Sequence, residues 1–283
     1  MTDQATSWIR RGDIEIAMIW DGTLTAEMKT ILRLDPAEAE RLVAAEATAT
    51  GSDPLVLPVR AFLFRIAGRL VLCDAGSGTT KGPTMGFLPS SLNKLGVSPA
   101  DIDAILLTHL HMDHIGGLTD AAGIPAFPRA ELVIHAREAE YFLDTPDDSL
   151  DARSRRHAAV QRSIVAAYGS RQRRVRDGEG LPGIAARLAP GHTPGHTAWM
   201  IGQGAHTVAA IGDVVHMAAI QLPRPLTPMI YDVDPDLAGR SRIALLDEIA
   251  TSRALVAGAH LSHRGLGTID KHGDAYTYTA LAV

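Results

Sequence analysis

The sequence predicts an α+β fold that forms a single domain over residues 1–283, with an N-terminal tail over residues 1–12. Predicted strands and helices alternate along the chain, but without the regular βαβ rhythm of a doubly wound sheet. Hydrophobic residues make up 46% of the chain and charged residues 21%, which provides enough apolar side chains for a sizeable core. Linker-like segments, low-complexity segments and clear repeats are absent from the 283 residues, so nothing divides the chain into domains.

Helices are predicted where capping residues precede a helical pattern. Asp35-Pro36-Ala37-Glu38 combines an N-cap, a proline at the first helical position and a carboxylate at the third, so a helix is expected to continue to about Ala47. Ser98-Pro99 repeats this start and predicts a brief helical turn. Three further helices are expected over residues 138–143, over an arginine-rich segment ending at Tyr168, and over residues 237–251.

Short apolar runs between these helices predict β-strands. The predicted strands are residues 14–19, 60–66, 69–73, 103–108, 132–135, 185–188, 208–213 and 254–259. The single cysteine, Cys73, cannot form an internal disulfide and is expected to be a small buried hydrophobe within one of these strands.

The run His109-Leu-His-Met-Asp-His114 places four potential metal ligands within six residues. Imidazole and carboxylate together suit zinc and its first-row neighbours, whereas calcium and magnesium prefer oxygen ligands alone. Ligands at alternate positions of an extended segment share one side, so His109, His111 and Asp113 are expected to converge. His114 would join them if the chain turns after Asp113, which the glycine pair just beyond allows. A chance histidine-rich loop is the alternative, but such a run need not follow an apolar strand.

The remaining ligands have to come from later segments. In Pro190-Gly-His-Thr-Pro-Gly-His-Thr197 either His192 or His196 could face a metal, and we favour His196 because it directly precedes an apolar run. Asp213 and His260 each follow a predicted strand, and a buried unpaired charge at Asp213 would be costly. Taken alone, either residue could instead have a capping or hydrogen-bonding role.

This series of motifs resembles the metallo-β-lactamase superfamily in order, spacing and local context. The resemblance implies a four-layer αββα sandwich with a dinuclear metal site at one edge. It implies that His109, His111 and His196 hold the first metal, that Asp113, His114 and His260 hold the second, and that Asp213 bridges both. An Asp-x-Gly at residues 74–76 is also typical of the superfamily, which implies that Asp74 supports the metal-binding histidines.

The resemblance implies a hydrolase that uses two divalent metal ions, Zn²⁺ first, with Mn, Fe or Co as alternatives. A water bridging two ions about 3.5 to 4 Å apart would have its pKa lowered towards about 7. The resulting hydroxide would attack a carbonyl carbon or a phosphorus centre, and Asp113 would orient it as well as bind metal. No serine nucleophile competes, because Gly76-Ser77-Gly78 is too short for a GxSxG elbow.

Segments around the later ligands indicate which branch of the superfamily the chain resembles. Residues 212–221, 232–235 and 257–261 resemble the methyl parathion hydrolase group. Many acyl-homoserine lactonases of the superfamily carry a tyrosine three residues beyond the bridging aspartate, where this chain has His216. His216 is a candidate catalytic proton donor or substrate hydrogen-bond partner, and a core histidine is the alternative.

The expected substrate is a small hydrophobic ester, lactone or phosphotriester. A quorum-quenching acyl-homoserine lactonase is one alternative, and a persulfide dioxygenase-like oxidoreductase with a single iron is another. A non-catalytic binding protein is the third class, but such a protein would more often have lost ligands. Several apolar residues could line a substrate pocket, although ordinary core packing is the commoner role of such residues. They are Trp20, Phe62, Phe64, Met85, Phe87, Leu88 and the segment 222–228.

Charge and hydropathy indicate which partners to expect. The net charge of -5 argues against general affinity for nucleic acid, and arginines clustered within residues 153–176 are interpreted as a solvated helix face or a subunit contact. The N-terminus lacks a signal-peptide pattern and no apolar run reaches bilayer-spanning length, so no membrane partner and a cytoplasmic location are expected. A small-molecule substrate remains the expected partner, and the resemblance implies a possible homodimer.

Overall fold

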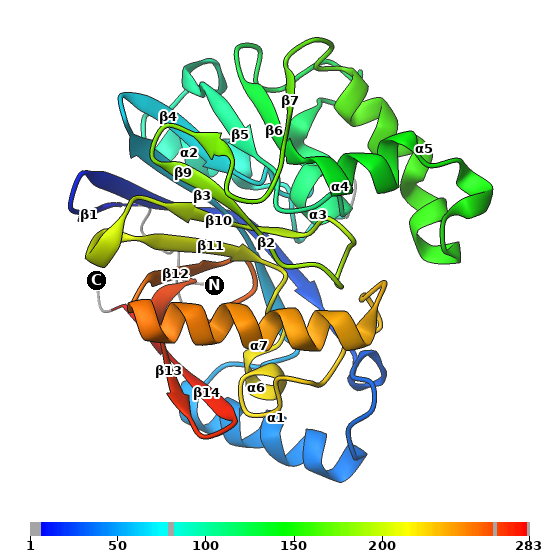
Figure 1. The fold of residues 1–283 in the computed structure, drawn as a ribbon, viewed down its shortest axis with the longest axis vertical. Helices are drawn as coiled ribbons and strands as arrows, with labels where there is room; N and C mark the ends of the chain where they lie inside the picture. The colour runs from blue at the N-terminus through cyan, green and yellow to red at the C-terminus, as the bar shows by residue number, and fades with distance from the viewer. Residues whose placement is uncertain (1–6, 79–81, 263–264, 282–283) are drawn as a thin grey trace.

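Two seven-stranded β-sheets pack face to face with helices outside them in the computed structural model, which describes residues 7–78, 82–262 and 265–281. Figure 1 shows the sheets crossing the molecule, with α5 beside the first sheet and α7 in front of the second. The architecture is the four-layer αββα sandwich expected from the sequence.

The first sheet contains the N-terminal strands in chain order, β1 to β7. Its strands are β1 (Trp8–Arg11), β2 (Ile14–Thr25), β3 (Val56–Ile66), β4 (Arg69–Cys73), β5 (Ala104–Leu106), β6 (Glu131–His135) and β7 (Gln172–Val175). The first four strands pair antiparallel, whereas β4 to β7 pair parallel. Parallel pairing needs crossover connections, and the long connections after β4, β5 and β6 carry helices.

The second sheet contains the C-terminal strands in chain order, β8 to β14. Its strands are β8 (Gly180–Leu181), β9 (Ile184–Leu188), β10 (Thr197–Ile201), β11 (Val208–Gly212), β12 (Leu255–Gly258), β13 (Leu266–His272) and β14 (Ala275–Ala280). Its one parallel pair within the described residues is β11 with β12, and α7 makes the crossover between them. In parallel strands the carboxyl ends meet at one edge, so residues just after β11 and β12 lie together.

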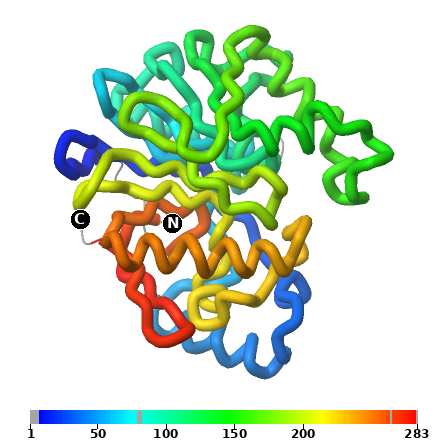
Figure 2. Tube along the Cα trace, in the orientation of Figure 1, coloured from blue at the N-terminus to red at the C-terminus, as the bar shows by residue number. Residues whose placement is uncertain are grey.

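The helices cover the outer faces of the sheets. The α-helices are α1 (Pro36–Thr50), α2 (Leu88–Lys94), α3 (Met112–Ile115), α4 (Ala136–Ala139), α5 (Ala152–Ala166), α6 (Ala218–Gln221) and α7 (Pro235–Ser252). Asp35 caps α1 by accepting a hydrogen bond from the Glu38 amide at 3.1 Å, as the sequence predicts. Figure 2 shows the blue α1 segment beside the yellow α6 segment, where Ala39 and Ile220 share one apolar cluster.

The core follows the alternation of side chains along each strand. On β3, Phe62 and Phe64 point between the sheets, while Ala61 and Leu63 point towards the outer helices of the first sheet. Cys73 is buried between the sheets, as expected. Phe62 and Phe64 are therefore core residues rather than pocket residues.

Two expectations about local structure are wrong. Residues 8–11 form β1 and pair with β2, so they do not belong to an N-terminal tail over residues 1–12, of which residues 1–6 lie outside the described chain. The strand expected over 103–108 ends at Leu106, and helix α3 begins at Met112. Asp113 therefore lies on a helical turn, not on an extended segment.

Candidate metal centre

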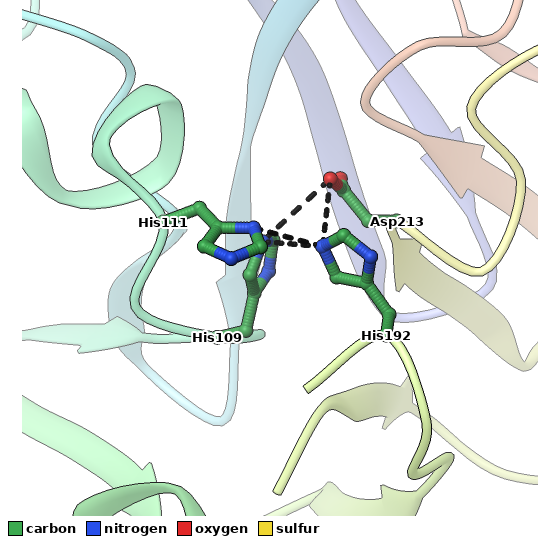
Figure 3. A group of neighbouring side chains, drawn as sticks. All are labelled: His109, His111, His192 and Asp213. Atoms are coloured by element: carbon green, nitrogen blue, oxygen red, sulfur yellow. Dashed lines mark hydrogen bonds and ion pairs between the residues drawn. The ribbon is translucent and has the colours of Figure 1, made fainter. Parts of the chain in front are cut away.

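A first group of potential ligands gathers four side chains from three segments. His109 and His111 follow β5, His192 lies between β9 and β10, and Asp213 follows β11. Nε2 of His192 lies 3.2 Å from Nε2 of His109 and 2.9 Å from Nδ1 of His111. Figure 3 shows the three rings and the Asp213 carboxylate pointing towards a common centre. The donor atoms lie within 4.8 Å of one another.

A second group lies beside the first and shares Asp213 with it. Asp113 and His114 come from α3, and His260 comes from the segment after β12. Nε2 of His114 lies 3.7 Å from Oδ2 of Asp113, and Nε2 of His260 lies 3.8 Å from the same oxygen. The donor atoms of Asp113, His114, Asp213 and His260 again lie within 4.8 Å of one another.

Asp213 directs one carboxylate oxygen to each group. Its Oδ1 lies 2.9 Å from Nε2 of His114 and 3.2 Å from Nε2 of His260. Its Oδ2 lies 3.4 Å from Nε2 of His192 and 3.6 Å from Nε2 of His109. The residue is only 2% exposed, so its charge is removed from water. This is the arrangement that a bridging carboxylate between two cations requires.

Three histidines of the two groups are held from behind through their other ring nitrogen. Nδ1 of His114 lies 2.8 Å from Oδ2 of Asp74, and Nδ1 of His260 lies 2.7 Å from the carbonyl oxygen of Pro58. Nδ1 of His192 lies 3.0 Å from Oδ1 of Asp232. Such partners fix the tautomer and leave the opposite nitrogen available for a metal.

Burial controls the charge of the first group. Desolvation lowers the pKa of His109 and His111 well below the usual histidine range, so both rings are neutral at pH 7. Neutral imidazole is the form that binds a metal. Burial opposes ionisation of Asp232, but its hydrogen bond with His192 and the nearby charges of His192, His216 and Arg242 together outweigh this and lower the pKa of Asp232 to about 2.

These residues fit divalent metal ions of the zinc type. Nε2 of His114 and Oδ1 of Asp213 are buried 2.9 Å apart without a well-oriented hydrogen bond to any described residue, and both belong to the second group. Nitrogen and carboxylate donors in two groups of four, with one shared carboxylate, match the donor set that zinc and its neighbours prefer.

The structure brings together all but one of the ligands expected from the sequence. The exception is His196, whose place beside His109 and His111 is taken by His192. Nε2 of His196 instead accepts a hydrogen bond from the backbone N–H of Asp213 at 3.0 Å. The favoured choice of His196 is corrected on this ground, because a nitrogen that accepts this bond supports Asp213 rather than facing the group.

Three further residues around the site were not assigned a role from the sequence. Asp232 orients His192, and Glu138 accepts hydrogen bonds from the two segments that carry the first group. Asp232 lies in a segment that the branch resemblance already marked, whereas a single glutamate on a predicted helix carries no such signal. Gln161 donates a hydrogen bond from Nε2 to the carbonyl oxygen of Leu110 at 2.7 Å.

His216 lies at the rim of both groups. Its Nε2 is 2.9 Å from Oδ2 of Asp213, and its ring stacks on that of His260 with centroids 5.6 Å apart. The ring of Tyr231 also lies beside His216, with ring centroids 5.6 Å apart. Burial lowers the pKa of His216.

A cavity of about 210 Å³ opens above the two groups. Its floor contains Asp113, Asp213 and His216, and Leu24, Leu57, Met112 and Tyr231 supply apolar contacts. Arg153, His157 and Gln161, spaced four residues apart on α5, form its polar side. Of the pocket residues expected from the sequence, Trp20 lines a neighbouring cavity of about 580 Å³ that shares His216 and His260 with this one.

The fold and the paired ligand groups define an αββα sandwich with a candidate dinuclear metal centre, and sequence comparison identifies its family. The profile of the metallo-beta-lactamase superfamily matches residues 54–260, so the chain belongs to this superfamily. A probable metallo-hydrolase of Mycobacterium tuberculosis is 27% identical over 185 residues, which cover 61% of this chain and 54% of that protein. An N-acyl homoserine lactonase, AttM of Azorhizobium caulinodans, is 27% identical over 121 residues, 40% of each chain. The chain thus matches about half the length of these relatives.

Solved structures extend the similarity over the whole fold. The hydrolase AbOPH superposes with a TM-score of 0.92 at 25% identity, covering 100% of this chain and 99% of that chain. AidC, described as a dizinc quorum-quenching lactonase in complex with a product, superposes with a TM-score of 0.89 at 25% identity, covering 99% of each chain. Within the described residues, no helix is both long and apolar enough to cross a membrane.

Proposed function

We propose that the chain is a dinuclear metal-dependent hydrolase of small hydrophobic esters, lactones or phosphotriesters, as the methyl parathion hydrolase resemblance also implies. The observation that carries this proposal is the pair of ligand groups joined by Asp213, which line a cavity that also has apolar walls. His109, His111 and His192 would hold one ion, and Asp113, His114 and His260 the other, with Zn²⁺ the first candidate. Two bound cations would lower the pKa of a water molecule and polarise the carbonyl or phosphoryl group of the substrate.

The residues of the chain would complete this chemistry by orientation. Asp113 lines the cavity and is close to both histidines of the second group, so it can orient the attacking water as well as bind an ion. His216 also lines the cavity and is positioned to donate a hydrogen bond or a proton to the substrate. Leu24, Leu57 and Tyr231 would exclude bulk water and favour an apolar substituent.

Acyl-homoserine lactone hydrolysis is the second candidate, and the close superposition with AidC favours it. The presence of His216 three residues beyond Asp213, where many lactonases carry tyrosine, favours the broader esterase proposal instead. A mononuclear iron oxygenase is less well supported, because both ligand groups are complete. A homodimer stays a prediction from the resemblance.

Metal content and a substrate panel together test the proposal. The purified protein should bind two metal ions and hydrolyse at least one of p-nitrophenyl esters, acyl-homoserine lactones and methyl parathion. His111→Ala and Asp213→Ala should each reduce both bound metal and activity. Turnover of lactones alone would select the second candidate, and a single bound iron without hydrolysis would refute both.

A further inference from the structure

Glu138 is a buried carboxylate with three donors from two different loops. It lies on α4 and is 1% exposed. Its Oε1 accepts a hydrogen bond from the backbone N–H of Leu110 at 2.8 Å. Its Oε2 accepts from Oγ1 of Thr193 at 2.7 Å and from the backbone N–H of Gly195 at 3.0 Å.

The donors belong to the segments that carry the first ligand group. Leu110 lies between His109 and His111, and Thr193 directly follows His192. One side chain therefore connects two loops more than 80 residues apart in the sequence, at the point where their histidines meet.

The loop that carries Gly195 passes too close to α4 for residue 195 to have a side chain. A Cβ atom on Gly195 would lie 2.0 Å from the backbone nitrogen of Glu138, so the loop can approach α4 this closely only because residue 195 is glycine. The carbonyl of Leu110 is held as well, by Gln161. The backbone N–H and the carbonyl of Leu110 are thus both held by buried side chains, those of Glu138 and Gln161.

We infer that Glu138 is a positioning residue that sets the distance between His192 and the pair His109 and His111, and thereby the affinity of the first metal position. The inference rests on the proposed dinuclear site. Its hydrogen bonds within the described chain all end on loops of the first group, so its effect is selective for that group. Asp74 holds His114 of the second group, and it also accepts a hydrogen bond from Thr108, which precedes His109 of the first group.

An amide at position 138 cannot replace the carboxylate. The three partners are donors, and Gln has one acceptor oxygen and an NH₂ group that would face at least one of those donors. Glu138→Gln keeps the size of the side chain while it disturbs at least one loop. Loss of such outer contacts typically weakens metal binding about 10- to 100-fold.

The test is competition between the protein and chelators of graded strength, with zinc content as the readout. It is run at about pH 8.5, because burial raises the pKa of Glu138 to about 7 and the ionised form is then present. Wild type should retain two zinc ions, and Glu138→Gln should lose one of them at least tenfold more readily while it retains the other. In the cobalt-substituted protein, the visible absorption of one site should change.

Asp103→Asn is a matched control. Asp103 also accepts a backbone hydrogen bond, from Leu70 at 2.9 Å, but at the opposite end of β4 and β5. The zinc content of the Asp103→Asn variant should equal that of the wild-type protein. Thr193→Val removes a single donor and replaces Glu138→Gln in the test if that variant does not fold. It should lower the zinc affinity of the same site by a smaller factor.

The outcomes separate this inference from the proposed function. If wild type binds fewer than two metal ions, the proposed function fails. The positioning role of Glu138 is refuted if wild type binds two ions but neither Glu138→Gln nor Thr193→Val changes chelator competition. It is also refuted if the substitutions lower the affinity for both ions equally.

Discussion

Replacing each histidine of the PGHTPGHT loop by alanine should give opposite results. Nε2 of His192 lies among the nitrogens of His109 and His111, whereas Nε2 of His196 accepts a hydrogen bond from the backbone of Asp213. His192→Ala should therefore remove one zinc ion, and His196→Ala should leave the zinc content at two while it destabilises the fold.

The expected magnitudes follow from the two environments. Structural zinc in four-ligand sites binds with about 10 to 16 kcal/mol, so one ligand contributes about 2.5 to 4 kcal/mol, or about a 70- to 900-fold change in affinity. His196→Ala leaves the buried N–H of Asp213 without its acceptor, which costs about 1 to 3 kcal/mol, and opens a cavity at a fully buried position.

The assay combines zinc content after dialysis, activity on the best substrate of the panel, and urea unfolding of the zinc-loaded proteins. His192→Ala should lose activity at low zinc and regain part of it at high zinc. His196→Ala should shift the unfolding midpoint to lower urea with zinc content unchanged. Loss of a zinc ion from His196→Ala, together with full zinc content in His192→Ala, would refute the assignment of His192.

Three further predictions concern the second group, the N-cap of α5 and the cavity. Asp74→Asn should lower the affinity for the zinc ion of the second group about 10- to 100-fold, because the carboxylate that holds His114 is lost. Chelator competition measures this affinity. Asp151 caps α5, and its hydrogen bonds lower its pKa to about 2 although burial raises it, so Asp151→Ala should cost about 1 kcal/mol above pH 4. The difference from wild type should shrink as the pH falls from about 4 to 2 in urea unfolding, because the group is ionised in the folded state only above its folded pKa. Arg153→Met removes a guanidinium 4.7 Å from the Tyr231 ring and should raise KM about two- to fivefold with zinc content unchanged, measured by steady-state kinetics.

The strands could be predicted because the alternation of side chains along each strand is a local feature of the sequence. Residues on β3 alternate between the two apolar clusters, and such alternation is visible in the sequence as a strand. The order of the strands could not be derived from alternation, because it depends on which segments pair. The resemblance supplied the four-layer arrangement, with which the described sheets agree, but it did not supply the order of the strands.

The ligands could be predicted where one short segment carries several of them, or where a polar residue follows a predicted strand, as Asp213 and His260 do. The run from His109 to His114 fixes four of them, whatever the conformation of that segment. The choice between His192 and His196 failed because both follow Pro-Gly and precede Thr, so local sequence does not separate them. What separates them is Asp232, 40 residues away from His192, and the backbone of Asp213. Both are tertiary contacts that no local pattern encodes.

Each ligand group takes residues from both halves of the sandwich. In the first group, His109 and His111 follow a strand of the first sheet, while His192 and Asp213 follow strands of the second sheet. The second group repeats this division, with His114 from the first half and His260 from the second. A bound ion would therefore hold the sheets together at this edge, and ion binding would stabilise the folded chain by mass action. Loss of a ligand thus weakens both the chemistry and the fold, whereas loss of a cavity residue such as Arg153 should affect substrate binding alone.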